Sequence, residues 1–286
     1  IDLREEGPLP ACPVCGASGW SPRRDWTGLR ACGGCGTYVN DRARSRQEEE
    51  ARYLEVSAQA EGGDPGLAAR RWMWAGPLAA QGRKDGPLSV LDVGCGEGAY
   101  LLAARQAGCR TAGIEINSRA AAAGRRRGLD VACGSLFDVG VPSGPWDLIT
   151  FWDVLDQLEE PPEALRLAAR NLAPDGLLIV RGRNARIHVP VKKATLRLRR
   201  LAPALPVPDP AVVHRWGLAP AGFTSLLRGA GLSDIRLHAD LPRRSWLSVP
   251  AQLVHRAFLG RLYPFSSVLA SGRKPAGQPG SSHGLP

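Results

Sequence analysis

A glycine-rich turn sets the narrowest limit on the architecture of this chain. Residues 90–98 read VLDVGCGEG, follow directly on an apolar segment and lead into a helix-like one. Gly94, Gly96 and Gly98 tolerate a positive φ and let a ligand approach the backbone closely. In a strand–turn–helix unit, such a loop lies at the carboxyl edge of a parallel sheet, where ligands bind. We therefore expect a bound cofactor at this turn.

Strand-like apolar runs alternate with helical patterns beyond this turn. The expected strands are residues 88–93, 111–116, 129–132, 146–151, 177–181, 234–238 and 265–271, and the expected helices are residues 99–107, 118–128, 162–172 and 219–229. Asn117 is expected to cap the second of these helices. About forty residues after Arg181, first basic and then proline-rich, interrupt the alternation. The pattern predicts an α/β fold with a doubly wound, seven-stranded, mostly parallel sheet.

Four cysteines near the N-terminus form two matched pairs. Cys12 and Cys15 are separated by two residues, as are Cys32 and Cys35, with sixteen residues between the pairs. This spacing is typical of a zinc ribbon in which four thiolates hold a structural zinc ion. Free or redox-active cysteine pairs are the alternative. The remaining cysteines are expected to be small buried hydrophobic residues, and they are Cys95, Cys109 and Cys133.

Charge and hydropathy limit the compartment and the partners. The 286 residues include 37 basic and 27 acidic side chains, a net charge of +10. This charge favours a polyanionic partner, but 33 of the basic residues are Arg, alongside 34 Gly and 24 Pro, and this bias is typical of GC-rich codons. Residues 181–200 hold eight basic residues and no carboxylate. Since no long apolar run and no leader pattern is present, we expect a cytoplasmic protein without a transmembrane segment.

Acidic residues beside the glycine turn discriminate between two cofactors. Asp92 precedes the turn, and Glu115 ends the second expected strand, where a carboxylate can accept both ribose hydroxyls. A dinucleotide is the alternative, but its usual GxGxxG pattern places the third glycine one residue later. Asp92 and Glu97 would also repel a pyrophosphate. The zwitterionic S-adenosylmethionine is therefore favoured.

Five motifs in order resemble those of class I S-adenosylmethionine-dependent methyltransferases. They read VLDVGCGEG, GIEIN, CGSLFD, WDLITFWDVLDQLEEP and LAPDGLLIVRGRN, and the resemblance extends over residues 88–275. With these motifs and the CPVCG and CGGCG segments near its N-terminus, the chain most resembles a bacterial subgroup of this family that carries an N-terminal zinc ribbon. The resemblance implies a Rossmann-like methyltransferase fold. It says nothing about the acceptor.

The resemblance also implies roles for individual positions. The loop would lie against the methionine part of the cofactor, Glu115 with Ile116 would bind ribose, and Ser135 and Leu136 would border adenine. Phe151 to Asp153 would close the methionine side. The implied cofactor-binding residues are thus Asp92, Gly94, Cys95, Gly96, Gly98, Glu115, Ile116, Ser135, Leu136, Phe151 and Asp153.

Two departures from the family pattern matter. Relatives often carry Glu-His where this chain has Asp156-Gln157, so no role of that His is transferred. The adenine segment, Ser135-Leu136, lacks the acidic residue that many relatives place there. We expect backbone groups to supply more of the adenine contact.

The motifs divide the chain into successive parts. We expect a zinc ribbon at 1–41, a helical linker or cap at 42–85, the methyltransferase domain at 86–275 and a disordered tail at 276–286. The linker is expected to hold helices at 42–60 and 67–80. Insertions at 182–218 and 239–262 are expected to select the acceptor.

Methyl transfer from a sulfonium requires alignment more than acid–base chemistry. His214 is the first candidate for a general base and Asp153 the second. The arginines of both insertions suit a phosphate-bearing acceptor, so the favoured substrate is a small molecule, a sugar or glycan, or a lipid-linked intermediate. Two alternatives stay open, an RNA methyltransferase and a non-catalytic protein that binds the cofactor. Peripheral contact with a membrane is also open.

Overall fold

The computed structural model describes most of the chain. The described residues are 11–21, 28–40, 48, 64–81, 86–201, 214–238 and 267–277. The predicted helix at 42–60 and the predicted insertion at 239–262 therefore lie outside the described residues, apart from Glu48. Among the described residues, no helix has the length and apolar character needed to cross a bilayer.

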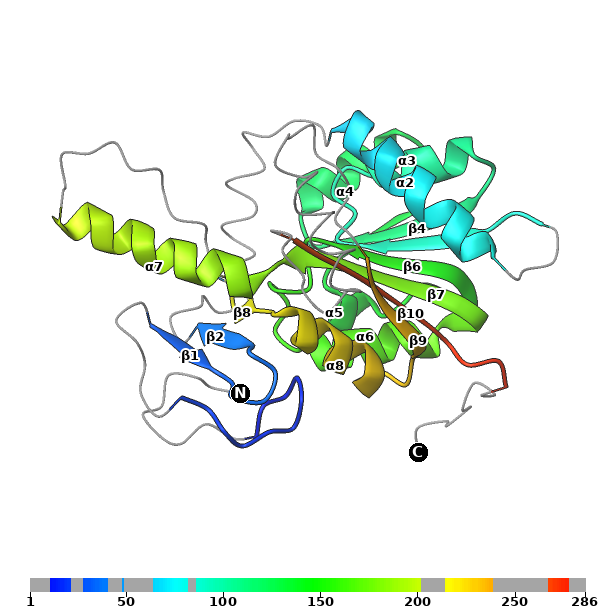
Figure 1. Ribbon diagram of the computed structural model, residues 1–286. Helices are drawn as coiled ribbons and strands as arrows, with labels where there is room; N and C mark the ends of the chain where they lie inside the picture. Colours follow the sequence, from blue (N-terminus) through cyan, green and yellow to red (C-terminus); the bar gives the residue numbers. More distant parts are fainter. Residues whose placement is uncertain are drawn as a thin grey trace.

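A seven-stranded sheet forms the centre of the molecule (Figure 1), in the order β5-β4-β3-β6-β7-β10-β9. Strand β10 runs antiparallel to its two neighbours, β7 and β9. All other neighbouring strands of this sheet are parallel. This confirms the predicted doubly wound, mostly parallel sheet. The strands are β3 (Ser89–Val93), β4 (Arg110–Glu115), β5 (Val131–Cys133), β6 (Trp146–Trp152), β7 (Leu172–Arg183), β9 (Ser233–His238) and β10 (Ser267–Arg273).

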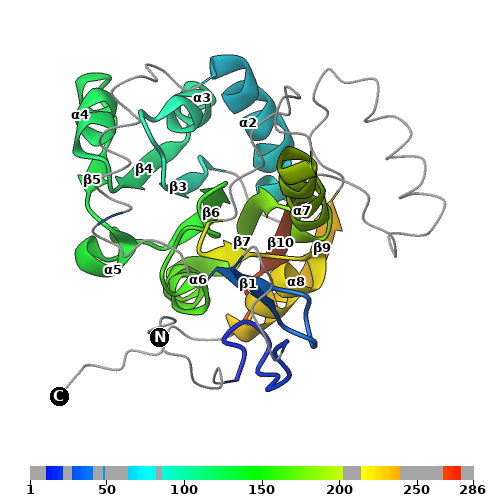
Figure 2. The ribbon, with the colours of Figure 1, turned by 90° about the vertical axis from the view of Figure 1, so that its left-hand side faces the viewer.

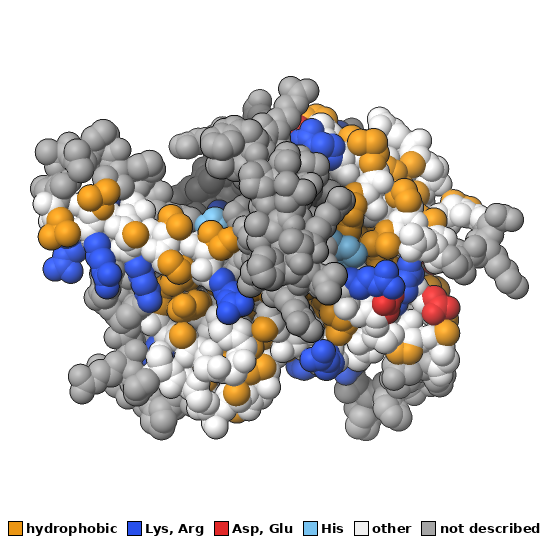
Figure 3. All heavy atoms as spheres, viewed as in Figure 1, with side chains coloured by type: hydrophobic (Ala, Val, Ile, Leu, Met, Phe, Trp, Pro, Cys, Tyr) orange, Lys and Arg blue, Asp and Glu red, His pale blue; other side chains and the backbone are white. Residues whose placement is uncertain are grey.

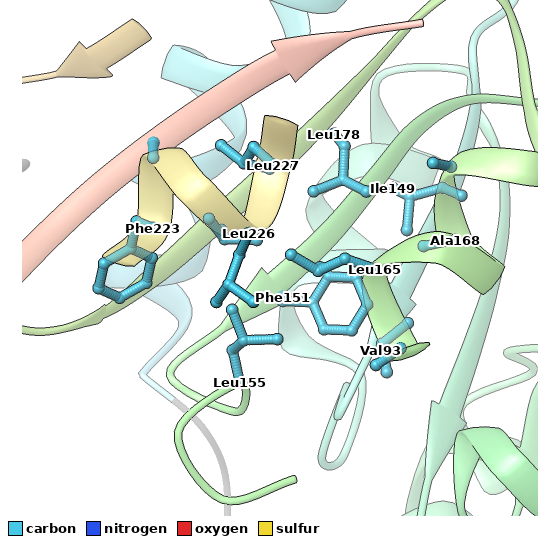
Figure 4. Packing of buried hydrophobic residues seen from close by; sticks show 14 of the residues in the cluster. Val93, Ile149, Phe151, Leu155, Leu165, Ala168, Leu178, Phe223, Leu226 and Leu227 are labelled. Carbon is cyan, nitrogen blue, oxygen red and sulfur yellow. The ribbon is translucent and has the colours of Figure 1, made fainter. Parts of the chain in front are cut away.

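Helices cover both faces of the sheet because neighbouring strand residues point to opposite sides. Along β7, Leu178 and Val180 belong to one buried cluster, and Leu177 and Ile179 belong to the other. One face carries α2 (Pro65–Ala80), α3 (Ala99–Gln106) and α4 (Ser118–Arg126), and the other carries α5 (Leu136–Val139), α6 (Pro161–Arg170) and α8 (Pro220–Gly229). Figure 4 shows the second face, where side chains of α6 and α8 meet those of β6 and β7.

The helix caps follow the sequence signals. Asn117 caps α4 as predicted, because its Oδ1 accepts hydrogen bonds from the backbone N–H of Arg119 at 2.9 Å and of Ala120 at 3.1 Å. Asp64 caps α2 in the same way, through Gly66 and Leu67. The glycine turn leads directly into α3, which precedes β4 in the chain. Helix α4 begins shortly after the carboxyl end of β4.

The segment after β7 differs from expectation. The predicted interruption of the alternation contains a 17-residue helix, α7 (Ala185–Leu201), with Pro190 inside it. Pro190 is the sixth residue of α7, so it removes the N–H that would bond the carbonyl of Arg186. The side chain of Asn184 accepts a hydrogen bond from the N–H of Arg186 at the start of the helix. Six basic residues without an acidic one gave no clear helical pattern in the sequence.

The four-cysteine segment forms a small sheet that the sequence did not reveal in full. Strands β1 (Leu29–Ala31) and β2 (Tyr38–Asn40) pair antiparallel, and β8 (Trp216–Gly217) adds a third strand beside β2. Cys12, Cys35 and Val39 belong to the same buried cluster as Trp216 and Phe223. Figure 2 shows this sheet against α8 and close to α7. We call residues 11–40 with β8 the cysteine module, and its core is continuous with that of the sheet.

Candidate functional site

The glycine turn takes the conformation that its sequence requires. Gly94, Gly96 and Gly98 have φ values of +75°, +56° and +82°, a region that favours glycine. A Cβ on Gly94 would lie 2.3 Å from Val154 Cγ2, and one on Gly98 would lie 2.1 Å from Leu129 Cδ1. A Cβ on Gly96 would meet nothing within 4 Å. The turn is therefore packed tightly at its two ends and leaves free space at its middle, which fits a ligand lying against Gly96.

Glu115 fixes the turn to the neighbouring strand. Its Oε2 accepts a hydrogen bond from the N–H of Gly96 at 2.8 Å, and its Oε1 accepts one from the N–H of Asn117 at 2.8 Å. Burial raises the pKa of this carboxyl group, and the two N–H donors counteract the shift. Each carboxylate oxygen keeps a further acceptor position. The group is thus placed to accept two hydroxyls while it holds the turn; Ile116, next in the chain, is half-buried.

Two buried side chains support the turn, that of Asp92 before it and that of Cys95 within it. The Asp92 side chain is only 3% exposed, and its Oδ1 accepts a hydrogen bond from Thr150 Oγ1 at 2.6 Å. Burial raises the pKa of Asp92 to about 7. Cys95 is buried too, and its Sγ packs against Gly113. A Cβ at position 113 would lie only 2.5 Å from this sulfur. These two residues support the turn from the interior of the sheet.

Asp153 lies between two arginines at the carboxyl end of β6. Arg181 Nη1 donates to both Asp153 oxygens, and Arg71 Nη2, from α2, donates to Oδ2 at 2.8 Å. Arg181 is 6% exposed and also donates to Ser267 Oγ at 2.9 Å. Asp153 has a φ of +61°, an unusual conformation for a residue with a side chain. Asp153, which the resemblance places at the methionine side of the cofactor, therefore already has two cationic partners.

Three buried polar atoms near this cluster have no hydrogen-bond partner among the described residues. They are Arg71 Nε, the Tyr100 hydroxyl and Trp152 Nε1. The Arg71 guanidinium lies 4.7 Å from the centre of the Trp152 ring, and Tyr100 packs edge-on against that ring. Because an unpaired buried polar group is costly, a ligand with polar ends that reaches this cluster fits the arrangement. Arg71 also interacts with the charge of Asp92, so this polar cluster combines two arginines with two carboxyl groups.

Sequence reasoning missed Arg71 and gave Arg181 no role at this site. Arg181 on β7 is the register partner of Trp152 on β6. The ends of these two adjacent parallel strands therefore indicated that Arg181 lies beside Asp153. Arg71 lies 82 positions before Asp153 on a helix that crosses the sheet, and no local pattern links the two residues.

The predicted adenine segment forms the start of α5. Ser135 Oγ accepts a hydrogen bond from the N–H of Phe137 at 3.2 Å and lies 3.1 Å from Asp138 Oδ2. Leu136 is buried. An acidic side chain, Asp138, lies three positions after Ser135 and accepts a hydrogen bond from its hydroxyl.

Comparison with known proteins identifies the family of the chain. A family described as "Methyltransferase domain" matches residues 67–237, more than half of the chain. The chain belongs to the class I S-adenosylmethionine-dependent methyltransferases. No curated protein matches the sequence.

Solved structures share the fold of this methyltransferase. The plantazolicin methyltransferase BpumL, in complex with a pentazolic desmethylPZN analog and SAH, is 15% identical, with a TM-score of 0.53 and coverage of 80% of this chain and 92% of that chain. The [4+2]-cyclase SpnF is 22% identical, with a TM-score of 0.51 and coverage of 82% and 98%. A SAM-dependent methyltransferase from Archaeoglobus fulgidus is 16% identical, with a TM-score of 0.48 and coverage of 80% and 100%. Since one of these proteins is a cyclase, the fold alone does not fix the acceptor.

The four N-terminal cysteines of the methyltransferase converge on one point. The Sγ atoms of Cys12 and Cys35 lie 3.9 Å apart, those of Cys15 and Cys32 lie 3.6 Å apart, and all four lie within 4.8 Å of one another. Two thiolates on one tetrahedral zinc ion lie about 3.8 Å apart, because each Zn–S bond is about 2.3 Å long. The donor set therefore fits zinc.

The other cysteines agree with expectation in two cases of three. Cys95 and Cys109 are buried, but Cys133 is exposed. The prediction that Cys133 is buried was wrong, because it ends the edge strand β5, where one side of the strand has no neighbour in the sheet.

His214 lies directly before β8. The N–H of Asn40, in β2, donates to the carbonyl of Arg215, and the N–H of Trp216 donates to the carbonyl of Asp156, each at 3.0 Å. His214 itself is half-buried. The cysteine module and the segment after β6 therefore hold this part of the chain from both sides.

Asp156 is a buried carboxyl group with an incomplete set of partners. Its side chain is 7% exposed, and its Oδ1 has no hydrogen-bond partner among the described residues. Burial, followed by the charge of Asp153, raises the pKa of Asp156 to about 7, although Arg183 counteracts the shift. Above this pH the folded protein carries a poorly compensated charge.

We expect Asp156→Asn to stabilise the protein increasingly as the pH rises above about 4, with the full gain reached near pH 7. The folded state retains a proton that the unfolded chain releases above the ordinary value of 3.8, so the free energy of unfolding of the wild type falls as pH rises from about 4 to about 7. The amide avoids this loss, and the variant should gain up to about 4 kcal/mol over the wild type near pH 8 and almost nothing near pH 4. Urea denaturation at both pH values measures the difference. Asp175→Asn, at an exposed position near the start of β7, is the matched control; an equal gain at both pH values would contradict the assignment.

Proposed function

We propose that this methyltransferase transfers the methyl group of S-adenosylmethionine, by in-line displacement, to a small-molecule, sugar or glycan, or lipid-linked acceptor. One observation carries the cofactor assignment. The carboxylate of Glu115, at the carboxyl end of β4, accepts hydrogen bonds from the N–H groups of Gly96 and Asn117, and a carboxylate oxygen can accept more than one hydrogen bond. Such a group suits a ribose with two free hydroxyls.

The remaining cofactor contacts follow from the positions around Glu115. The bound cofactor supplies a methyl group that is already activated for displacement. Gly94 to Gly98 and the backbone of Phe151, whose side chain lies in the core, would contact its methionine part, and Ser135, Leu136 and Asp138 would border adenine. Arg71, with its unpaired Nε, would bind the methionine carboxylate. Asp92 and Cys95 would support the turn with their buried side chains.

We propose that Cys12, Cys15, Cys32 and Cys35 hold a structural zinc ion. The Sγ distances suit a tetrahedral site, and four thiolates leave no open position for catalysis. The ion would replace the apolar core that so short a segment lacks.

His214 is the stronger of the two candidates for a general base. Asp153 already binds Arg71 and Arg181 through both of its oxygens, so an acceptor hydroxyl would have to displace an arginine. His214 lies in a segment that is hydrogen-bonded to the cysteine module through Asn40 and to the backbone of Asp156. We propose that it removes a proton from the acceptor where the acceptor is a hydroxyl.

Calorimetry and a transfer screen test the proposed function. We expect the zinc-loaded protein to bind S-adenosylmethionine and its demethylated product with micromolar or lower dissociation constants. Transfer of labelled methyl groups to sugar phosphates, lipid-linked glycans and RNA then identifies the acceptor class, with His214→Ala assayed alongside. Binding without transfer to any class would leave a non-catalytic protein. Full turnover by His214→Ala would exclude the histidine as base.

A further inference from the structure

Helix α7 extends beyond the body of the protein (Figure 1). It begins at Ala185, two residues after the end of β7. The carboxyl end of β7 lies at the same edge of the sheet as the glycine turn. Its first half is anchored, since Ala185 and Val189 are buried in a cluster with Leu29, and Tyr38 packs against that cluster. The helix therefore connects the cysteine module with the cofactor edge.

The side of α7 opposite this anchor is apolar and exposed. At about 100° per residue, Val191, Leu198 and Leu201 fall on the side opposite Ala185 and Val189. Their exposed fractions are 54%, 43% and 85%, respectively. Only two other large hydrophobic residues among those described are exposed, Met73 and Val139. Exposed apolar side chains are thus concentrated on this one helix face, which we call the outer face of α7.

Basic side chains lie beside the outer face and behind it. The helix carries six basic residues and no acidic one. At 100° per residue, Arg186, Lys193 and Arg197 fall on one flank of the outer face, and Lys192, Arg199 and Arg200 fall nearer the anchored side. Figure 3 shows a row of basic side chains along the extended helix, with apolar side chains beside it. Arg197 and Arg200 are exposed.

We infer that the outer face of α7 lies on an anionic lipid surface. An interfacial helix combines apolar side chains, which enter the boundary between headgroups and acyl chains, with basic flanks that meet anionic headgroups. The helix is too short and too charged to cross a bilayer. It would bring the cofactor edge of the sheet close to the lipid headgroups. The inference does not depend on methyl transfer, because binding to lipid can be measured without an acceptor.

Two other partners suit the outer face less well. RNA would pair with the basic side chains, but the exposed apolar side chains would contribute nothing to it, and α7 has no aromatic residue on which a base could stack. A second copy of the chain would place six basic residues against six more without a carboxylate on either helix. An anionic bilayer offers an apolar interior to the exposed apolar side chains and negative headgroups to the basic side chains.

Cosedimentation with lipid vesicles tests the inference. We expect the full-length, zinc-loaded protein to bind vesicles that contain roughly a third phosphatidylglycerol and to bind pure phosphatidylcholine at least tenfold more weakly. The triple variant Val191→Gln, Leu198→Gln, Leu201→Gln should lose at least tenfold in partitioning to the anionic vesicles, because its apolar side chains no longer enter the interface. Met73→Gln, which replaces an exposed apolar residue on α2, should bind like the wild type.

A charge-reversal pair tests the basic side chains separately. Arg197→Glu with Arg200→Glu should also weaken binding to anionic vesicles at least tenfold, and added salt should weaken wild-type binding. Arg126→Glu with Arg228→Glu changes the net charge equally on α4 and α8, where both arginines are exposed, and should retain most of the binding. Circular dichroism and cofactor affinity show that each variant is folded.

Three results would overturn the inference. One is equal binding to anionic and neutral vesicles. Another is equal loss in the α7 variants and in their matched controls. The third is the absence of vesicle binding by a wild-type protein that instead binds RNA, or that forms a dimer which the triple variant converts to a monomer.

Discussion

Replacement of Glu115 by Gln should weaken the affinity for S-adenosylmethionine about a hundredfold. Hydrogen bonds that involve a charged group contribute about 1.5–3 kcal/mol each, and the loss of about 2.7 kcal/mol corresponds to a hundredfold change in Kd. The amide has a second effect, because the N–H groups of Gly96 and Asn117 need two acceptor oxygens and Gln offers only one. The turn should therefore lose its fixed conformation as well as its partner for ribose. Isothermal titration calorimetry measures the change.

Glu97→Gln is the matched control for this variant. Glu97 lies in the same turn, but its side chain forms an ion pair with Arg127 at 2.7 Å near the surface. Exposed pairs contribute little to stability, so we expect an affinity within about threefold of the wild type. A Glu115→Gln protein that binds the cofactor as tightly as Glu97→Gln would show that ribose is held elsewhere.

Cys32→Ser should abolish zinc binding and destabilise the whole protein. Cys32 is 2% exposed and belongs to the same buried cluster as Val39, Phe223 and Leu226. Loss of a structural zinc ion removes folding free energy directly, and here it also loosens the packing against α8. We expect the melting temperature to fall by about 10 °C, which corresponds to a few kcal/mol for a protein of this size. Elemental analysis and thermal unfolding measure both effects, and strong chelators should reproduce them.

Cys133→Ser separates this effect from general thiol loss. Cys133 is exposed at the end of β5 and lies outside the cysteine module. The variant should keep one equivalent of zinc and a melting temperature within about 2 °C of the wild type. If Cys32→Ser retains the metal, or loses it without destabilisation, the four thiolates do not form a structural site.

Local signals account for the parts of the fold that the sequence predicted. Asn117 before an alanine-rich segment specifies a cap by its own side chain, and the glycine pattern at 94–98 specifies a turn that other residues cannot adopt. The strands were recognisable because a parallel sheet buried on both faces leaves continuous apolar runs. The paired cysteines were recognisable because thiolate ligands need a fixed spacing.

Contacts between distant segments account for the rest. Arg71 reaches Asp153 from α2, and no pattern within either segment reports this pairing. Helix α7 was missed because Pro190 and the basic residues obscured its period, although apolar residues occur on two opposite sides of it. Strand β8 has only two residues, and it exists as a strand because β2 provides a partner. Such features follow from tertiary packing, which sequence periodicity does not encode.

The two-residue strand β8 also imposes an order on biosynthesis. The ribosome produces β1 and β2 early, but their third strand emerges some 175 residues later. At translation rates of about 5–20 residues per second, this delay lasts roughly ten to thirty-five seconds. During that interval the outer edge of β2 has no strand beside it, and Val39 lacks the tryptophan that later covers it. A nascent chain that stalls before Gly217 would therefore present an open strand edge to neighbouring chains, and such an edge is a site at which chains can aggregate.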